Sequence, residues 1–138
     1  MSVNQQHSMA PLVQILGTGI DLVENARIAA SIEKFGDHFL HRIFTANEIA
    51  YCAPKPNSIP HYAARFAAKE AVSKCFGTGI GKQLGWLDME VTNDEAGAPH
   101  IVLHGAGIEL AAARGVRQIF VSLTHTDAYA AASATIAG

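Results

Sequence analysis

Apolar side chains along the chain fall into short runs whose spacing predicts a strand followed by helices. Residues 12–23, LVQILGTGIDLV, are mostly apolar and are interrupted by Gly17 and Gly19, and this run predicts a strand. Residues 24–35 place their apolar side chains at helical intervals, and Gly36 ends that helix. The fold is therefore expected to begin with one strand that leads directly into a helix.

The central part of the chain is predicted to be mainly helical. A short helical piece, DHFLHRI, occupies 37–43, and Thr45 with Glu48 forms a capping box that opens a helix to about Cys52. The strongest helical pattern runs over 61–76, and its apolar stripe consists of Ala64, Ala68, Ala71, Val72 and Cys75. Three prolines are expected to break the chain before this helix: Pro54, Pro56 and Pro60.

The remaining sequence predicts mostly strands. A hairpin is expected from strands at 86–92 and 99–103, followed by a short helix at 108–114 and two more strands at 116–124 and 128–136. This order favours an α+β fold, a single domain over 12–138 with helices packed on a mostly antiparallel sheet. Residues 1–11 are polar and are expected to form a flexible N-terminal tail.

Composition and charge exclude several classes of protein. Apolar residues make up 49% of the chain and charged residues 16%, which rules out a disordered protein. The net charge of −2 leaves no basic excess for a general nucleic-acid binder, and no apolar run approaches the roughly 20 residues of a membrane span. The two cysteines, Cys52 and Cys75, have no CxxC spacing, so we expect reduced thiols in a cytoplasmic protein without an export signal.

Asp21 is the first candidate for a functional residue. It lies between Ile20 and Leu22 in the predicted first strand, where an unpaired carboxylate is costly to bury. One interpretation is that Asp21 caps the helix that begins near Glu24. The other is that Asp21 and a second carboxylate, for which Glu70 is the best candidate, hold a hard cation such as Mg²⁺ through oxygen atoms.

The long predicted helix carries polar residues on the face opposite its alanines. Phe66, Glu70, Ser73, Lys74 and Gly77 share that face at helical spacing. One interpretation is a solvated face with an ion pair between Glu70 and Lys74, four residues apart. The other is a ligand site, which the spacing alone does not establish.

Two further segments are candidates for ligand binding. The glycine-rich GTGIGK at 77–82 is one residue short of a Walker loop, is followed by Gln83 and comes after a helix, so a P-loop is excluded. A glycine turn that lets backbone approach a ligand stays open. His125, between two predicted strands, is interpreted either as a turn residue or as a donor to an anionic ligand.

Four segments, taken in order, resemble 4′-phosphopantetheinyl transferases. GID, which begins at Gly19, and the later RFAAKEAVSK match a two-part signature whose second part has the form (F/W)-x-x-K-E-(A/S)-x-x-K. RIFTANE, the continuation CFGTGIG and the later SLTHT resemble the short bacterial subgroup, the holo-acyl-carrier-protein synthases. The resemblance covers about residues 14–136 and implies the fold of that family.

The resemblance also implies an activity. The family transfers 4′-phosphopantetheine from coenzyme A to a serine of apo acyl carrier protein and releases adenosine 3′,5′-bisphosphate. Carried over to this sequence, Asp21 and Glu70 would hold Mg²⁺ at the pyrophosphate, and Lys74 would neutralise the leaving phosphate. Glu70 or a metal-bound water would take the serine proton. Val23 stands where larger relatives place another acid, so water and phosphate oxygens would complete the metal shell.

Further residues receive binding roles from the same resemblance. Arg65 and His125 would contact the phosphates of coenzyme A, and Gly77 would allow close approach of that ligand. The helix over 24–35 would carry the contacts with the acidic carrier protein through Arg27 and Lys34, which lie close to one face. An ordinary solvated face is the alternative for these two side chains.

The assembly is also predicted. The predicted strands carry more apolar surface than one layer of helices covers, and with the resemblance this predicts a homotrimer with coenzyme A sites at subunit interfaces. The residues that motivate it are Ile20, Leu22, Ile119, Val121, Tyr129 and Ala131. A non-catalytic module that binds coenzyme A or a carrier protein on the same fold is the alternative to the transferase.

Overall fold

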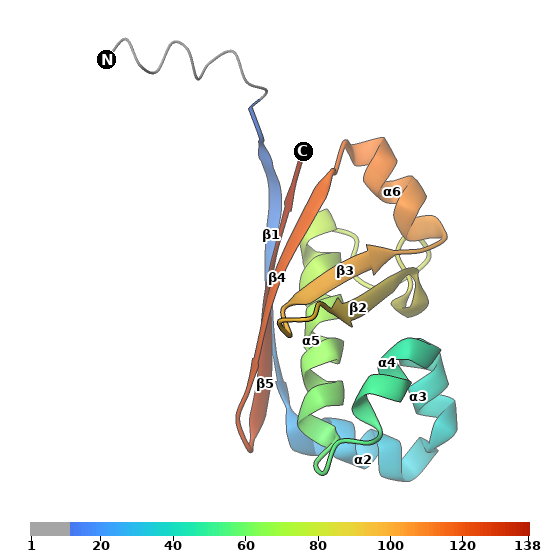
Figure 1. Ribbon diagram of the computed structural model, residues 1–138. Helices are drawn as coiled ribbons and strands as arrows, with labels where there is room; N and C mark the ends of the chain where they lie inside the picture. Colours follow the sequence, from blue (N-terminus) through green and yellow to red (C-terminus); the bar gives the residue numbers. More distant parts are fainter. Residues whose placement is uncertain (1–11) are drawn as a thin grey trace.

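A computed structural model describes residues 12–138, and the predicted N-terminal tail lies outside the described residues. The elements follow in the order β1 (Ile15–Glu24), α2 (Asn25–Phe35), α3 (Asp37–Ile43), α4 (Ala46–Cys52), α5 (Ile59–Phe76), η1 (Trp86–Asp88), β2 (Met89–Asn93), β3 (Pro99–Leu103), α6 (Ala106–Arg114), β4 (Gln118–His125) and β5 (Tyr129–Ala137). Figure 1 shows the long strands on one side of α5 and the remaining elements on the other. The predicted α+β class is confirmed.

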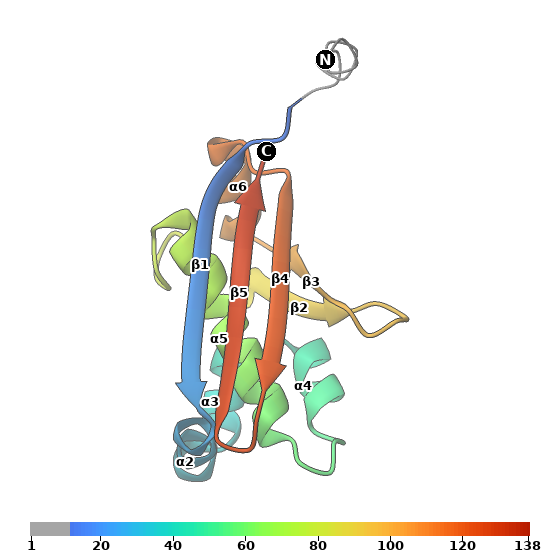
Figure 2. The same ribbon diagram turned by 90° about the vertical axis from the view of Figure 1, so that its left-hand side faces the viewer.

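The three long strands form one antiparallel sheet in the order β1-β5-β4, and β2 pairs with β3 in a separate antiparallel hairpin. One face of the sheet packs on α5, because alternate side chains of the central strand β5 are buried: Ala130, Ala132, Ala134 and Ile136. In Figure 2 this sheet lies in front of the helices, and no described element covers its outer face.

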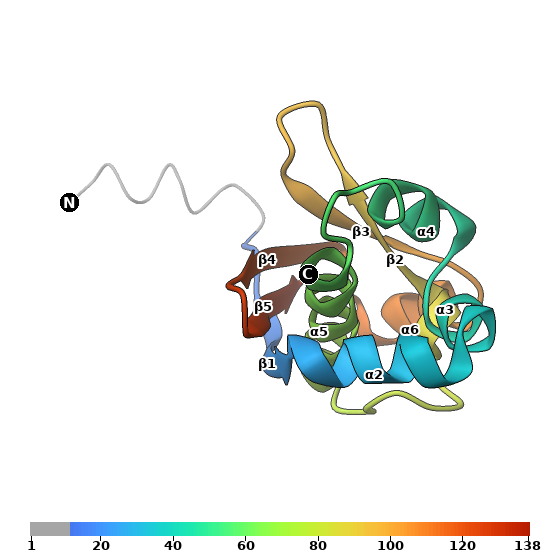
Figure 3. The ribbon, with the colours of Figure 1, turned by 90° about the horizontal axis from the view of Figure 1, so that it is seen from below.

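Helix α5 forms the centre of the molecule. Figure 3 looks along this helix and shows the sheet, α2, α4 and the β2–β3 hairpin arranged around it. Small side chains let these elements approach it closely, and the alanines with no exposed surface are Ala63, Ala67, Ala68 and Ala71. Pro60 lies within the first turn, where its missing N–H leaves no helical bond unmade. The prediction that Pro60 would separate this helix from the preceding chain is therefore wrong, and α5 begins at Ile59.

The β2–β3 hairpin is confirmed with one change at its start. Residues Trp86–Asp88 form a 3₁₀ turn, so the strand begins at Met89. Asp88 stabilises the turn because its carboxylate accepts the backbone N–H of Gly85 at 2.8 Å. This local hydrogen bond gives the Gly85 N–H a partner within the turn, so a turn forms where the weak apolar alternation predicted a strand.

The outer face of the three-stranded sheet is apolar and exposed. Ile20, Leu22, Phe120 and Tyr129 are 69%, 65%, 53% and 47% exposed. Ile119 and Val121, which the sequence analysis counted with this surface, instead pack against the core on the inner face. The prediction of excess apolar strand surface therefore holds for Ile20, Leu22 and Tyr129, while Ala131 is half-buried. Phe120 adds to the exposed surface.

Among the described residues, no helix is both long enough and apolar enough to cross a membrane. Cys52 and Cys75 are free and buried, as predicted for reduced thiols. Burial raises the pKa of each thiol to about 11.

Candidate functional site

Two glycines bring β1 into contact with the backbone of α5. A Cβ atom at Gly17 would lie 2.2 Å from the carbonyl oxygen of Cys75, and one at Gly19 would lie 2.0 Å from that of Ala71. Neither position has room for a side chain, so strand and helix touch directly. Asp21 follows Gly19 by two residues and lies on the same face of the strand, which directs it toward α5.

Asp21 pairs with a cation. The Nζ atom of Lys74 lies 3.2 Å from Asp21 Oδ1 and donates a 2.8 Å hydrogen bond to the carbonyl of Ile20. The N-cap of α2 is Glu24, and none of the side chains in the described part of the chain caps that helix. The interpretation of Asp21 as a helix cap is therefore wrong, and its side chain, only 16% exposed, has the cationic partner that burial requires.

Glu70 lies close enough to Asp21 and Lys74 for their charges to shift the pKa of its carboxyl. Burial raises the pKa of the Glu70 carboxyl, and the charge of Asp21 raises it further, while Lys74 and Arg27 oppose the shift. The structure thus brings Asp21, Glu70 and Lys74 together. A cleft opens beside them, lined by Thr18, Gly19, Ile20 and Lys74.

The polar face of α5 is only partly open to solvent. Phe66 and Ser73 are buried, and Lys74 makes its ion pair with Asp21 on β1. The interpretation of a solvated face is therefore wrong for Phe66 and Ser73 and holds for Lys74 and Gly77, which are exposed. The ion pair of Lys74 is with Asp21 rather than with Glu70.

The donor set of this site fits a hard divalent cation. Asp21 and Glu70 supply carboxylate oxygens, the ligands that Mg²⁺ prefers, and Mg²⁺ usually keeps several waters or substrate phosphates in its shell. Within 12–138, no three His, Cys, Asp or Glu side chains lie together as a complete cage. Burial and the charge of Asp21 both raise the pKa of Glu70, and a bound cation would oppose both effects.

The residues predicted to contact phosphates lie toward the start of α5. Arg65 is 3% exposed, and its guanidinium donates to the carbonyl of His61 and to Oδ1 of Asn93. His125 ends β4, and its ring centre lies 5.2 Å from that of His61. Arg65 precedes Glu70 by five residues, a helical rise of about 7.5 Å. The structure therefore joins Arg65 and His125 to one another through His61, at a distance from Asp21 and Lys74.

Gly77 ends α5 in a left-handed conformation with φ of 74°, which other residues adopt at a cost. A Cβ atom at this position would meet nothing within 4 Å. The conformation therefore explains the glycine, and the space beside it is open. Its predicted role in approaching a ligand stays a prediction.

The predicted docking residues lie at two ends of α2. The guanidinium of Arg27 lies 5.5 Å from the centre of the Phe66 ring on α5, and Arg27 also lowers the pKa of Glu70. Lys34 is in the last turn, where its ammonium lies 5.2 Å from the centre of the Phe35 ring. Both side chains are exposed, and Arg27 lies near the candidate metal ligands.

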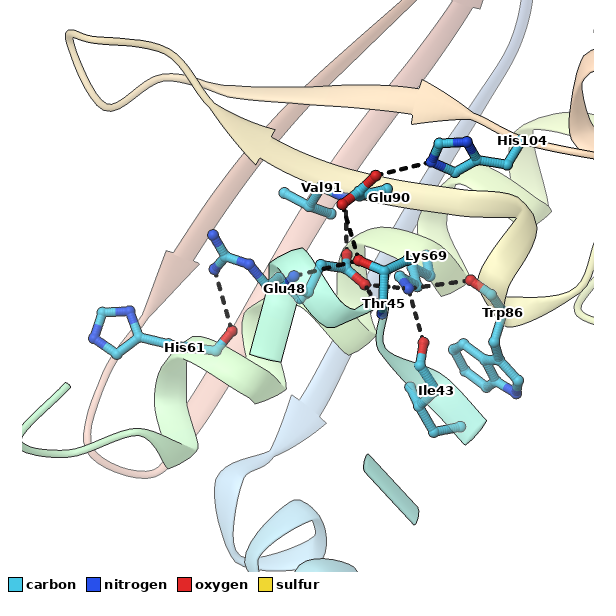
Figure 4. A network of polar contacts seen from close by, with 10 residues as sticks. Ile43, Thr45, Glu48, His61, Lys69, Trp86, Glu90, Val91 and His104 are labelled. Carbon is cyan, nitrogen blue, oxygen red and sulfur yellow. Dashed lines mark hydrogen bonds and ion pairs between the residues drawn. The ribbon is translucent and has the colours of Figure 1, made fainter. Parts of the chain in front are cut away.

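A buried ion pair beside the site was missed by the sequence analysis. Lys69 and Glu48 have no exposed side-chain surface, and the Nζ atom of Lys69 lies 2.6 Å from Oε1 of Glu48. Figure 4 shows Lys69 also donating to the carbonyls of Ile43 and Trp86, at 2.7 and 3.1 Å. All three ammonium protons are therefore used, and Lys69 fixes one side of α5 while its neighbour Glu70 faces the site.

Both carboxylate oxygens of Glu48 accept further hydrogen bonds from the backbone. Its carboxylate accepts the backbone N–H groups of Thr45 and Val91 at 2.9 and 2.8 Å. The capping box predicted from Thr45 and Glu48 is confirmed. The motif identified Glu48 as a capping residue. It did not indicate the ion pair of Glu48 with Lys69, which is 21 residues away in sequence.

Comparison with known proteins gives the family of this fold and site. The family model described as the 4′-phosphopantetheinyl transferase superfamily matches residues 17–134. A holo-[acyl-carrier-protein] synthase from Koribacter versatilis is 50% identical over 119 residues, which cover 86% of this chain and 95% of the relative.

Solved structures of holo-[acyl-carrier-protein] synthases have a similar fold. The Helicobacter pylori holo-[acyl-carrier-protein] synthase in complex with coenzyme A is 34% identical with a TM-score of 0.76, over 86% of this chain and 98% of that one. The Neisseria meningitidis enzyme is 28% identical with a TM-score of 0.84, over 89% and 98% of the two chains. The chain belongs to the 4′-phosphopantetheinyl transferase superfamily. The relatives named above are all holo-[acyl-carrier-protein] synthases, the short subgroup that its sequence resembles.

Proposed function

We infer that this chain is a holo-[acyl-carrier-protein] synthase, an enzyme of fatty acid biosynthesis. It transfers 4′-phosphopantetheine from coenzyme A to a serine of apo acyl carrier protein and releases adenosine 3′,5′-bisphosphate. The observation that carries this inference is the meeting of Asp21, Glu70 and Lys74 beside a cleft, in a chain whose relatives have that activity.

The chemistry needs charge and positioning rather than a covalent intermediate on the protein. We propose that Asp21 and Glu70 hold Mg²⁺, which when bound supplies electrostatic stabilisation to the pyrophosphate. Lys74 reaches the same place from the next turn of α5, and its half-exposed ammonium is free to contact a phosphate oxygen while it stays near Asp21. It would stabilise negative charge on the leaving group.

We propose that the phosphates of coenzyme A extend from this site toward the start of α5. Arg65 and His125 would contact them there, and Gly77 would border the ligand at the other end of the helix. The closeness of both residues to His61 supports a shared role, and water screens the charge of the buried Arg65 side chain only weakly.

The carrier protein would dock on α2 through Arg27 and Lys34. Carrier proteins are acidic, and both side chains are exposed cations on a helix next to the site. Arg27 lies beside the candidate site, because its guanidinium contacts the Phe66 ring on α5.

We further propose a homotrimer with coenzyme A sites at the subunit interfaces. The exposed apolar outer face of the sheet supports this assembly, because monomeric proteins rarely leave such a surface open. Ile20 and Leu22 flank Asp21 in β1, so an interface on that face would border the site. Buried, unpaired thiols are compatible with the reducing cytoplasm, where we place the enzyme.

The activity is tested by incubating the protein with coenzyme A, Mg²⁺ and apo acyl carrier protein. Mass spectrometry should show a phosphopantetheine adduct on the carrier protein. Glu70→Gln should abolish the adduct, while Glu109→Gln, an exposed glutamate on α6, should not. Binding of coenzyme A without any adduct from the wild-type protein would indicate the non-catalytic module instead.

A further inference from the structure

The turn between β4 and β5 is exposed along its whole length. Every residue over 124–129 is exposed, so apolar packing does not fix this part of the chain. Within the turn, the backbone N–H of Thr126 donates to the carbonyl of Tyr129 at 2.7 Å, and the Thr126 hydroxyl accepts the N–H of Tyr129 at 3.0 Å. These bonds close the turn on itself and leave its position against the neighbouring helices to other contacts.

A single residue of α2 binds three consecutive carbonyls of this turn, at the lower end of the sheet in Figure 2. Asn25, the first residue of α2, donates its backbone N–H to the carbonyl of Ala128 at 2.8 Å. Its side-chain Nδ2 donates to the carbonyls of Thr126 and Asp127 at 2.8 and 3.1 Å. Both Nδ2 protons are therefore used, and they join segments that lie 101 and 102 residues apart in sequence.

The free energy of folding does not explain why an asparagine is buried at this position. Asn25 is 5% exposed, and its Oδ1 is buried without a hydrogen-bond partner among the described residues. Such an acceptor is destabilising, whereas a leucine of similar size would leave no polar atom unpaired. Water would satisfy the carbonyls of the exposed turn if the amide were absent. The amide is therefore better explained by the segment that it holds in place.

We propose that Asn25 is a positioning residue for coenzyme A, which holds the β4–β5 turn against α2 and thereby sets the position of His125. This proposal rests on the proposed function, in which His125 contacts a phosphate of coenzyme A. His125 directly precedes Thr126, whose carbonyl accepts the shorter of the two bonds from the Asn25 side chain. The His125 ring lies 5.2 Å from that of His61, so α5 locates the ring while α2 locates the main chain beside it.

The expected benefit is a turn that is already ordered before the ligand arrives. A loop that becomes ordered only on binding lowers the affinity, because its conformational entropy is lost at that step. The candidate metal ligands Asp21 and Glu70 lie on β1 and α5, outside the turn. Loss of the Asn25 amide should therefore weaken the binding of coenzyme A and leave the chemical step and the docking of the carrier protein largely unchanged.

The test is the steady-state kinetics of Asn25→Leu with coenzyme A, Mg²⁺ and apo acyl carrier protein. The KM for coenzyme A should rise about fivefold, the loss expected when one hydrogen bond to a phosphate is weakened. The kcat and the KM for the carrier protein should change by less than about twofold. Asn25→Ala, which is too small to clash, should have the same effect. Asn57→Leu, on an exposed asparagine that lines the cleft beside Asn25, is the matched control and should change none of these constants.

Two further measurements show whether Asn25 acts through the turn and through His125. Amide hydrogen exchange over 125–129 should be faster in Asn25→Leu, while the urea midpoint at a fixed protein concentration moves by less than about 0.5 M. The double variant Asn25→Leu with His125→Gln should have no higher KM for coenzyme A than His125→Gln alone, because the residue that Asn25 positions is then absent.

Several results would overturn the proposal. They are an unchanged KM for coenzyme A in Asn25→Leu, a rise in the KM for the carrier protein in its place, and losses that multiply in the double variant. A fall of the urea midpoint by more than about 0.5 M would also overturn it, since Asn25 would then be a structural residue. In each of these cases, a wild-type protein that forms the carrier-protein adduct leaves the proposed function intact. A wild-type protein that neither binds coenzyme A nor forms the adduct would instead refute the proposed function.

Discussion

Replacement of Lys69 by methionine removes one partner of the buried ion pair beside the candidate functional site. Methionine keeps most of the volume of the side chain, so the packing of α5 is largely preserved. Glu48 then keeps a buried negative charge with two backbone N–H donors but no cation. The carbonyls of Ile43 and Trp86 lose the same donor.

The expected cost follows from the geometry of the pair. Both side chains are fully buried, and breaking a buried pair by removing one partner costs about 3–5 kcal/mol. Domains of this kind have a free energy of unfolding of about 5–15 kcal/mol, so Lys69→Met should remove a large fraction of the total. With an m-value of about 2 kcal/mol/M, the urea midpoint should fall by about 2 M.

The assay is urea unfolding followed by circular dichroism at one fixed protein concentration, because any association shifts the midpoint. Lys82→Met, on an exposed lysine after α5, is the matched control and should move the midpoint little. The double variant Glu48→Gln with Lys69→Met should recover at least about 1 kcal/mol, because it removes the uncompensated charge. A cost below about 1 kcal/mol for Lys69→Met, or a double variant that simply adds the two losses, would refute this reasoning.

Four other outcomes are expected. The folded state raises the pKa of Glu70 above its ordinary value, so this carboxyl binds its proton more tightly when folded and its contribution to stability is lost as the pH rises through the folded pKa. Glu70→Gln should therefore raise the unfolding midpoint of the metal-free protein near neutral pH while abolishing transfer, and an unchanged or lower midpoint would contradict the assignment. Lys74→Ala should lower kcat much more than the affinity for coenzyme A, whereas weak binding with normal turnover would make Lys74 a simple phosphate anchor. Arg27→Glu should raise the KM for apo carrier protein, flatten its salt dependence and leave the KM for coenzyme A nearly unchanged, and a rise in the latter would assign Arg27 to the nucleotide site. Because their pKa values are near 11, Cys52 and Cys75 should resist iodoacetamide at pH 8 in the folded protein, and labelling at the rate of a free thiol would show that one of them opens to solvent.

The sequence by itself determined the order and type of nearly every element, because hydrophobic spacing, capping residues and turn glycines act locally. The Thr45–Glu48 capping box is an example, since both partners lie within one helical turn and the motif specifies its own hydrogen bonds. The signature residues also identified Asp21, Glu70 and Lys74 as a set. Their chemistry could be inferred from residue type. The separation of 53 residues between Asp21 and Lys74 in sequence did not say how far apart they lie in the fold.

Only the tertiary structure decided which side chains meet. Gly17 and Gly19 admit the α5 backbone because strand and helix pack without side chains between them, and that contact turns Asp21 from a possible cap into the partner of Lys74. The burial of Lys69 follows from the elements that pack around α5. The sequence predicted one apolar and one polar face for this helix, but in the fold most of its side chains are buried. The pairing of His61 with His125 joins α5 to the end of β4. In each case the deciding contact is between residues far apart in the chain, and the free energy of such contacts depends on packing that no local pattern encodes.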